Sequence, residues 1–459
     1  MATCKKLSKL DLRSTIVHLN GLFSSQKTTK NFSLTQHSAW WSVHRGYFSG
    51  STASPTKSPL IRSQHKPYKD NSFFCRLHPG AAPSVRSFLA QYTSSSSSSS
   101  ASFLDLPVIK RPLIRYNPPG PPPPGQKHQT LTLYTITAIP EDELGDLRDA
   151  IFLRLVEYDI TGRIYLAKDG INLHLCAPIQ HVEALQSTLR DLVLDRFDHG
   201  LDGAIWNFST EAPGERVFEK LKVMVKKQLV ADGRLGQWSV TDAEAPQYLE
   251  PSEFHARLDQ VGDKVLLIDM RNHFENEVGR FKTSVKMDCT TFKENMDLMD
   301  ALLEGRDKKE EVLIVCTGGI RCSVSGRYLK QRGFTDVKML KGGITSYGRY
   351  IKSNPGIPSH FIGKNFTFDG RRGERITEDV ISSCHQCHAP NDHLTNCANV
   401  HCHLLFIQCP SCQEKWKHTC GPECRHTVET GTGPAASKPY DYHAQVRPGP
   451  LLAEVSKAA

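Results

Sequence analysis

The sequence predicts a mixed α/β protein with two α/β domains followed by a small cysteine-rich module. Three observations support this. Segment 129–235 alternates strand-like and helix-like patterns, segment 248–356 does so with short, wholly apolar strands, and eight of the 14 cysteines lie within 384–424. A chain of 459 residues has room for about three domains of ~150 residues each. No window approaches the ~18 uninterrupted apolar residues of a transmembrane helix, which excludes a membrane-spanning helix.

The N-terminal segment 1–104 is predicted to be a targeting sequence and not part of the fold. It holds thirteen Lys or Arg residues but only two acidic ones, Asp11 and Asp70, so the formal net charge of +9 is concentrated there. It ends in the run Ser94–Ser100 and lacks the apolar core of a secretory signal. An organellar transit peptide fits this composition, and the alternative is a disordered cytoplasmic tail. The pattern does not distinguish a mitochondrion from a chloroplast.

A proline-rich linker, 105–128, is expected before the first folded domain, 129–235, because polyproline is stiff and cannot join a sheet. The domain is predicted to contain strand, helix, strand, strand, helix and strand, at Leu131–Ile139, Glu141–Val156, Ile160–Leu166, Gly170–Cys176, Val182–Leu194 and Leu221–Lys227. The turn Lys168-Asp169-Gly170 predicts a hairpin between the second and third strands. This order indicates a ferredoxin-like sandwich built on a split βαβ unit.

The second domain, 248–356, is expected to have a parallel sheet, because its strands are uninterrupted apolar runs that suit burial on both faces. The predicted strands are Val265–Met270, Val312–Cys316 and Val337–Leu340, alternating with helices at Pro251–Leu258, Phe292–Leu303 and Cys322–Arg332. A cysteine-rich module is expected over 360–426. The tail 430–459 has few residues for a core and is predicted to be disordered.

The main candidate active site is the loop Cys316-Thr317-Gly318-Gly319-Ile320-Arg321-Cys322, between a buried strand and a helix. Its two glycines let backbone N–H groups point at one place, where they and the helix N-terminus stabilise an anion. A thiolate at Cys316 should therefore form readily, and Arg321 adds a fixed positive charge. The loop residues Thr317, Gly318, Gly319 and Ile320 are the expected substrate-binding positions. The alternative is a buried structural cysteine before a glycine turn.

Eight cysteines near the C-terminus are candidate metal ligands: Cys384, Cys387, Cys397, Cys402, Cys409, Cys412, Cys420 and Cys424. Two Cys-x2-Cys pairs have the spacing that presents two thiolates to one ion, and eight thiolates suffice for two tetrahedral zinc sites. A closed set of thiolates leaves no open position for substrate, so the expected role of zinc is structural. The pairing of ligands stays open, and nearby histidines could replace some cysteines: His385, His388, His401, His403 and His418. Free or disulfide-linked cysteines are the alternative.

The second domain resembles the rhodanese family. The resemblance is carried by three segments: the cysteine loop, Asp269-Met270-Arg271-Asn272 followed by Glu275 and Gly279 after a core strand, and Leu340-Lys341-Gly342-Gly343-Ile344 near the domain end. The loop from Cys316 to Arg321 has six residues. This length serves sulfur chemistry in that superfamily, whereas the loop of its phosphatase relatives has one residue more. The resemblance implies Cys316, Arg321, Asp269 and Arg271 as catalytic residues.

A narrower resemblance, to the rhodanese-related tRNA uridine hydroxylases, covers roughly residues 129–424. It is carried by Cys-Thr-Gly-Gly-Ile-Arg-Cys, by Gly170-Ile171-Asn172, by Leu221–Lys227 and by Phe366–Arg371. It implies a ferredoxin-like (acylphosphatase-like) domain, a rhodanese domain and a cysteine-rich extension. The implied reaction is oxygen-dependent hydroxylation of a wobble uridine in tRNA to 5-hydroxyuridine. No motif for an organic cofactor is evident.

Two other functions stay open: a thiosulfate or persulfide sulfurtransferase acting through a Cys316 persulfide, and an inactive domain whose zinc module recruits a partner. The intact loop argues against the second. The additional domains favour the hydroxylase, because a small sulfur acceptor requires neither. A sulfur donor or a reductant stays open as a further partner, and no membrane partner is expected.

Contact with tRNA is predicted at the basic strand, through Lys222, Lys226 and Lys227. Lys220, Lys222 and Lys226 would share one face, because alternate residues of a strand do so. Arg371, Arg372 and Arg375 form a second basic cluster. Phosphate contacts need only such charges, but a solvated surface face is an equally good explanation.

Overall fold

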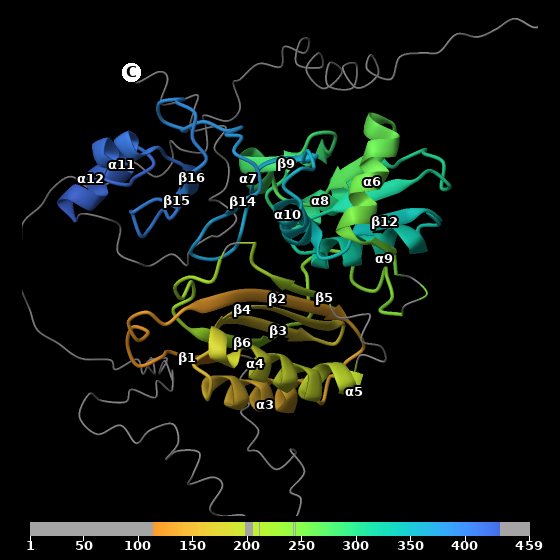
Figure 1. Ribbon diagram of the computed structural model, residues 1–459, viewed down its shortest axis with the longest axis horizontal. Coiled ribbons are helices and arrows are strands. Elements are labelled where there is room, and N and C mark those ends of the chain that lie inside the picture. The colour runs from red at the N-terminus through yellow and green to blue at the C-terminus, as the bar shows by residue number, and fades with distance from the viewer. Residues whose placement is uncertain (1–112, 198–204, 211, 242, 244, 432–459) are drawn as a thin grey trace, which may run out of the picture. The chain divides into compact units, whose positions relative to one another are not determined.

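The computed structural model describes residues 113–431, apart from 198–204, 211, 242 and 244 (Figure 1). The predicted targeting segment 1–104 and the part of the predicted tail beyond Gly431 lie outside the described residues. In the part of the chain that is described, no helix is both long enough and apolar enough to span a bilayer.

The first domain is a six-stranded sheet in the order β1-β6-β3-β4-β2-β5. Neighbouring strands are antiparallel except β3 and β6, which are parallel. The strands are β1 (Leu113–Tyr116), β2 (His128–Ile136), β3 (Thr161–Ala167), β4 (Gly170–Pro178), β5 (Ile205–Phe208) and β6 (Leu221–Val225). Gly170, in the predicted hairpin turn, has a φ of 137°, and a Cβ there would lie 2.1 Å from the Thr135 carbonyl oxygen. Glycine is therefore required at this turn.

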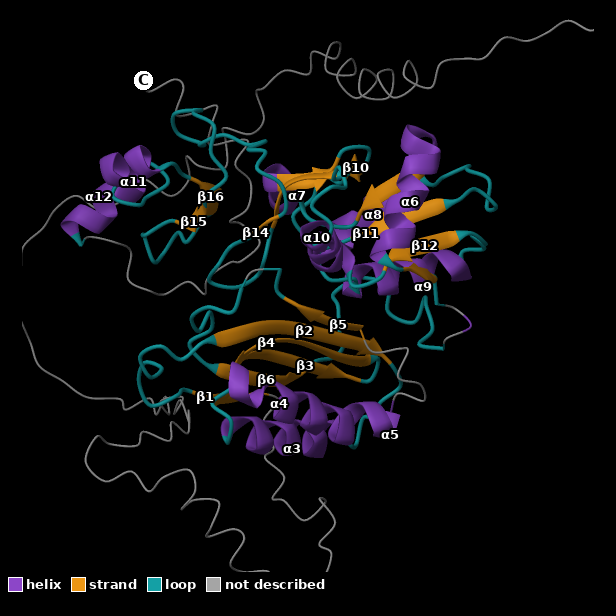
Figure 2. Cartoon of the chain, in the orientation of Figure 1, coloured by secondary structure: helices purple, strands orange, loops and turns teal. Residues whose placement is uncertain are grey.

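Among the described residues, the helices of this domain all lie on one face of this sheet, as Figure 2 shows. They are α3 (Leu144–Val156) and α4 (Val182–Leu189), and α4 continues through a π-helical turn (Arg190–Leu194) into α5 (Asp195–Phe197). Helix α3 buries Leu147, Ile151 and Leu155, which are four residues apart and so share one stripe of the helix. These leucine and isoleucine side chains join the core beneath the sheet. No described helix of this domain lies on the other face.

The ferredoxin-like arrangement is confirmed, with two corrections to its strands. The strand that completes it next to β2 is β5, not the basic strand β6. The four residues of β5 form too short a pattern to be recognised from sequence. Strand β6 instead extends the opposite side of the sheet, parallel to β3, and it pairs with β1, which lies within the segment expected as a linker.

The second domain contains a five-stranded parallel sheet in the order β10-β8-β11-β12-β7. Its strands are β7 (Gln247–Leu249), β8 (Leu266–Asp269), β10 (Val285–Lys286), β11 (Val312–Val315) and β12 (Val337–Leu340). Its helices are α6 (Pro251–Val261), α7 (His273–Val278), α8 (Phe292–Leu302), α9 (Ile320–Gln331) and α10 (Gly343–Ser353). Helices α8 and α9 pack on one face, whereas α6 and α10 pack on the other. The predicted buried parallel sheet is confirmed.

The chain after α10 returns to the second domain before it enters the cysteine-rich module. Strand β13 (Phe361–Asn365) pairs with β9 (Gly279–Phe281) and with β14 (Glu374–Arg375). The module has a two-stranded sheet, β15 (Leu394–Asn396) with β16 (Leu405–Ile407), and two helices, α11 (Pro410–Trp416) and α12 (Pro422–Thr430). So little regular structure buries few apolar side chains, which leaves the module to be stabilised by its cysteines.

Candidate active site

Cys316 directly follows β11 and is fully buried at the start of the predicted loop. The Gly319 N–H donates to the Cys316 sulfur over 3.1 Å. Gly319 has a φ of 107°, in the left-handed region, and immediately precedes α9. The loop therefore turns the N-terminus of α9 toward the sulfur, where its positive end favours an anion.

The pKa of the Cys316 thiol is lowered to about 6. Burial alone would raise this pKa, but three influences outweigh burial. The Cys322 thiol donates a hydrogen bond, the Arg321 guanidinium contributes positive charge, and backbone N–H groups of Cys322 and Gly319 donate as well. The pKa of Cys322 itself is raised well above its usual value by burial and by the neighbouring thiolate. Cys316 is thus ionised at neutral pH and Cys322 is its proton-bearing donor.

Replacing Cys322 by alanine is expected to raise the pKa of Cys316, because the thiolate loses a hydrogen-bond donor. The rate of Cys316 alkylation by iodoacetamide, measured against pH, should have its midpoint near 6 in the wild type and higher in Cys322→Ala. Cys289→Ala is the matched control, since that buried thiol is on another segment and outside the cavity described below. An unchanged midpoint in Cys322→Ala would refute the donor role.

Glu275, at the start of α7, determines the position of Arg321. The two side chains form a bidentate ion pair, with nitrogen–oxygen distances of 2.6 and 2.8 Å, and Glu275 is fully buried. The Thr317 hydroxyl donates to the same carboxylate over 2.8 Å. Glu275 was not predicted as a site residue. Its sequence signals are its place in the rhodanese-like segment that begins at Asp269 and its position three residues after Asn272, which indicates a capping box that it also forms.

Asp269, the last residue of β8, forms a separate, fully buried ion pair with Arg271, and neither residue lines the cavity. Arg271 also donates to the Asn276 side chain over 3.1 Å and to the Gly279 carbonyl oxygen over 2.8 Å. These contacts hold the C-terminal half of α7, the helix whose first turn contains Glu275. The catalytic role of Asp269 and Arg271 stays a prediction, and their geometry favours a positioning role.

A cavity of about 340 Å³ opens over the loop. Cys316, Thr317, Gly318, Ile320 and Arg321 line one side of it. The opposite side is the helix-free face of the first sheet, with further walls from residues after β6 and from the segment after β13. Its polar and aromatic lining from the sheet comprises Thr130, Thr132, Tyr134, Arg163, Tyr165, Asn172, His174 and Asn207.

The sheet and the loop make direct contacts beside Cys316. The Asn207 side-chain amide donates to the Gly318 carbonyl oxygen over 3.2 Å. The Ser323 hydroxyl donates to the Tyr134 hydroxyl over 3.2 Å. A Cβ at position 319 would lie 2.4 Å from that tyrosine oxygen, so glycine is required for close approach as well as for its φ. The first domain therefore helps to shape the cysteine loop.

Only some of the predicted substrate-binding residues lie at the cavity. Thr317, Gly318 and Ile320 line the cavity, and Gly319 contributes its N–H to the Cys316 sulfur. Lys226 also lines it, with its ammonium 4.6 Å from the centre of the Tyr165 ring. Lys222 and Lys227 do not line it. Lys222 lies on the same sheet face farther from the loop, whereas Lys227 is exposed beyond the end of β6.

The second basic cluster is engaged in interactions within the protein. Arg371 pairs with Asp369 at 2.6 Å, Arg372 donates to Asn396, and Arg375 pairs with Asp392. These contacts compete with any phosphate for the three guanidinium groups. This cluster is therefore better explained as part of the fold than as the predicted surface for RNA.

His174 lines the cavity and is paired with Asp369, which does not line it; neither residue was predicted. The His174 ring nitrogen lies 3.1 Å from the buried Asp369 carboxylate. Burial opposes ionisation of Asp369, but hydrogen bonds from His174 and Arg371 hold the pKa of its carboxyl well below the usual range. The two residues are nearly 200 positions apart in the chain, so only the folded protein brings them together.

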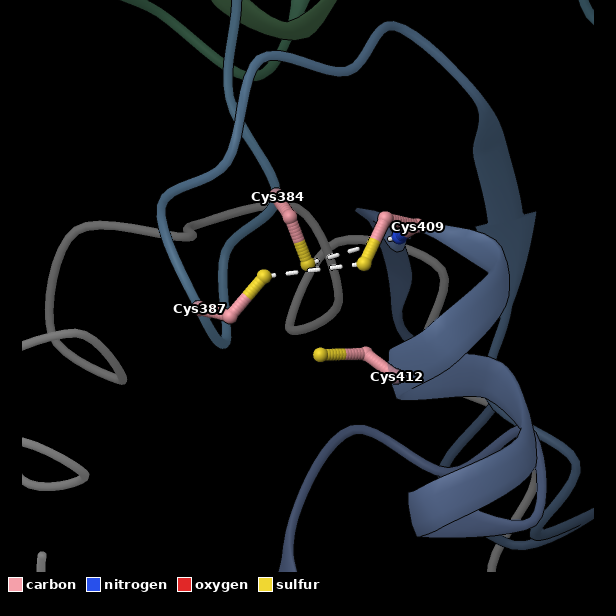
Figure 3. A group of neighbouring side chains, drawn as sticks. All are labelled: Cys384, Cys387, Cys409 and Cys412. Atoms are coloured by element: carbon pink, nitrogen blue, oxygen red, sulfur yellow. Dashed lines mark hydrogen bonds between the residues drawn. The ribbon is translucent and has the colours of Figure 1, made fainter.

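The eight C-terminal cysteines form two groups of four: Cys384, Cys387, Cys409 and Cys412, and Cys397, Cys402, Cys420 and Cys424. In each group the sulfur atoms all lie within 4.8 Å of one another. Figure 3 shows the first group converging on one point, with the Cys387 and Cys409 sulfurs 3.5 Å apart. The groups alternate along the chain, two cysteines at a time. Tetrahedral ligation by four thiolates fits both groups, and neither contains a histidine.

Three family models match the chain: the UPF0176 acylphosphatase like domain over residues 128–229, the rhodanese-like domain over 250–349, and the rhodanase C-terminal over 362–425. A rhodanese-like domain protein from Staphylococcus aureus, known from a crystal structure, aligns with 22% of this chain and 90% of its own, at 23% identity and a TM-score of 0.19.

Curated relatives match most of their own length. A tRNA uridine(34) hydroxylase from Citrobacter koseri is 39% identical over 296 residues, which are 64% of this chain and 81% of that protein. Proteins with the same name from Escherichia coli strain SE11 and Salmonella paratyphi B are 39% and 41% identical, each over 60% of this chain and 76% of the relative. The resemblance seen in the motifs is confirmed: the chain belongs to the tRNA uridine(34) hydroxylase family.

Proposed function

We propose that this protein hydroxylates C5 of a wobble uridine in tRNA, with the Cys316 thiolate as the catalytic group. The observation that carries the proposal is the cavity that joins an ionised cysteine to a polar sheet face in a chain of this family. A volume of about 340 Å³ falls within the usual range of small-ligand sites, ~300–1,000 Å³. A single nucleotide splayed out of an RNA loop is a substrate of suitable size.

The residues at the loop take distinct roles in this proposal. Cys316 is the group that adds to the uracil ring: its thiolate forms a bond to the electrophilic C6 carbon, and the C5–C6 double bond opens so that C5 becomes the nucleophile. Once C5 carries the hydroxyl group, loss of the C5 proton expels the thiolate, breaks the C6–sulfur bond and restores the double bond. Thr317, Gly318, Gly319 and Ile320 surround the substrate and stabilise charge through backbone N–H groups. Arg321 keeps Cys316 ionised. Glu275, together with the Asp269–Arg271 pair, positions that arginine.

The reaction is proposed to depend on molecular oxygen. One oxygen atom becomes the hydroxyl group on C5, and the other leaves as water. Forming water in this way takes two electrons and two protons, which an external reductant must supply. A reductant is therefore the partner expected besides tRNA.

A sulfurtransferase is the second candidate, and the loop itself favours it. Six residues from Cys316 to Arg321 surround a buried thiolate of lowered pKa, the arrangement expected for a carrier of persulfide sulfur. In that function the Cys316 thiolate takes the outer sulfur of a donor such as thiosulfate, which leaves as sulfite. An acceptor thiol then takes that sulfur, becomes a persulfide itself and returns Cys316 to the thiolate. Neither step requires the large polar face of the first sheet.

Mass spectrometry of tRNA distinguishes the two candidates. We expect nucleosides derived from 5-hydroxyuridine to disappear from wobble positions when the protein is absent. They should return with the wild-type gene but not with Cys316→Ser. Normal tRNA modification in the deletion strain, together with loss of thiosulfate sulfurtransferase activity, would establish the sulfurtransferase and refute the hydroxylase.

We also propose that each cysteine group holds one structural zinc ion and that residues 1–104 carry the protein to an organelle. The first proposal is supported by the two closed sets of four thiolates. The second is supported by composition alone, which is basic, serine-rich and poor in acidic residues.

A further inference from the structure

A row of polar and charged side chains crosses the helix-free face of the first sheet. Residues directly opposite each other on neighbouring strands lie on the same face. The strand register places the row in the order Arg115, Lys222, Arg163, His174, Thr132 and Asn207. Leu221 and Val223 flank Lys222 in the strand, and both belong to the core between the sheet and the helices. Lys222 therefore points to the opposite face, which carries no described helix of this domain.

One end of this row, Arg115, Lys222 and Arg163, consists of three adjacent cations, which we call the cationic row. Strands lie ~4.8 Å apart, so the cationic row is about 10 Å long. Burial lowers the pKa of Lys222, and the charges of Arg115, Lys220 and Arg163 lower it further. Among the described residues, no acidic side chain pairs with Arg115 or Lys222. Like charges directly opposite each other are destabilising, and a bound anion would relieve that repulsion.

The cationic row leads into the cavity. Arg163, His174, Thr132 and Asn207 all line it, and Asn207 contacts the cysteine loop at Gly318. Arg115, at the other end, is exposed. The row therefore runs from the protein surface to the residues beside Cys316. Arg163 stands at the junction, where its guanidinium donates to the Phe368 carbonyl oxygen and is held in place.

We propose that the cationic row binds consecutive phosphodiester groups of the RNA strand that adjoins the nucleotide in the cavity. The inference rests on the proposed function, because it takes the occupant of the cavity to be a nucleotide. Guanidinium and ammonium groups suit phosphate oxygens. A nucleic-acid strand presents several such groups in succession, as a row of cations requires, and it continues directly from a base held near Cys316. An acidic protein segment offers no such continuity.

The test compares a double variant, Arg115→Gln with Lys222→Gln, with the wild type for binding of an anticodon stem-loop RNA over a range of salt concentrations. Arg163 is left unchanged because it also contacts Phe368. Each phosphate contact with single-stranded nucleic acid contributes about 0.7 to the slope of log K against log salt. Loss of two contacts should reduce that slope by about 1.4 and weaken binding about 25-fold at 0.1 M salt. The matched control is Lys264→Gln with Lys309→Gln, which removes two exposed cations from the second domain.

RNA binding tests the cationic row, and hydroxylation of the RNA tests the proposed function. Each of the two can therefore fail without the other. The double variant should keep the wild-type melting temperature and the pH profile of Cys316 alkylation, which would show that the fold and the loop are intact. Equal affinity and equal salt slope in the double variant and the wild type would overturn the cationic row as an RNA site. The same loss of slope in the control variant would overturn it too, since any two cations would then suffice. A wild type that binds the stem-loop RNA without hydroxylating it would instead refute the proposed function.

Discussion

Replacing Cys316 by serine is expected to reduce hydroxylation of tRNA about a thousandfold or more, because removing a covalent catalyst costs at least that much in comparable enzymes. Serine is nearly the same size as cysteine and can accept the Gly319 hydrogen bond, so the fold should persist. It cannot replace the thiolate, since a hydroxyl stays protonated at neutral pH. The measurement is kcat/KM for the stem-loop RNA, accompanied by a thermal melt of each protein.

Cys289→Ala is the matched control for this experiment. Burial raises the pKa of Cys289 to about 12, and its thiol lies outside the cavity lining. This variant should keep wild-type kcat/KM, apart from any loss of stability. If Cys316→Ser retained more than a tenth of wild-type turnover, Cys316 would have no part in the mechanism.

Removing the metal is expected to unfold the cysteine-rich module. Purified protein should contain two equivalents of zinc per chain, one for each group of four cysteines. Binding of structural zinc to four such ligands is worth about 10–16 kcal/mol, far more than the small apolar core of this module can replace. A chelator should therefore make residues 384–430 sensitive to protease while the first two domains stay resistant.

Combined substitutions test how the ligands are grouped, because a second change removes more zinc only if it falls in the other group. Cys384→Ser should reduce the zinc content to about one equivalent, and adding Cys387→Ser should cause no further loss, because both cysteines belong to the same group. Adding Cys397→Ser instead should remove the second equivalent. Cys176→Ala, a buried cysteine of the first domain, should keep both. Less than half an equivalent in the wild type would contradict zinc binding, and iron with visible absorption would indicate a cluster in its place.

The cysteine loop could be predicted from sequence because all its parts are contiguous. Two glycines and an arginine follow Cys316 within five residues, between an apolar run and a helical pattern. That local order determines where the backbone N–H groups point, and the hydrogen bond from Gly319 to the sulfur follows from it. The same local reasoning suggested Arg321 as the neighbouring charge.

The rest of the cavity could not be predicted, because it depends on strand register. Tyr134, Arg163 and His174 come from three strands, and a shift of one residue would move each side chain to the opposite face. Lys222 and Lys226 were expected to contact RNA together, but only Lys226 reaches the cavity. Their distance from Cys316 follows from the position of β6 in the sheet, which its sequence does not reveal.

The spacing of the cysteines likewise does not determine which four of them form each group. Two Cys-x2-Cys pairs predict metal binding, but they are equally compatible with groups formed in chain order and with groups that alternate. The alternation depends on long-range contacts in the folded module, where the Cys409 N–H donates to the Cys384 sulfur and the Cys420 N–H donates to the Cys397 sulfur. Glu275 illustrates the same limit, since a capping residue acquires its ion pair with Arg321 only when α7 packs beside the loop.

The most direct test of the central claim is mass spectrometry of stem-loop RNA after incubation with purified protein, a reductant and isotopically heavy dioxygen. The account predicts that the wobble uridine gains one heavy oxygen atom on C5 with the wild-type protein and none with Cys316→Ser. An unmodified uridine with folded wild-type protein whose Cys316 is alkylated normally, or a product whose new oxygen comes from water, would contradict the account.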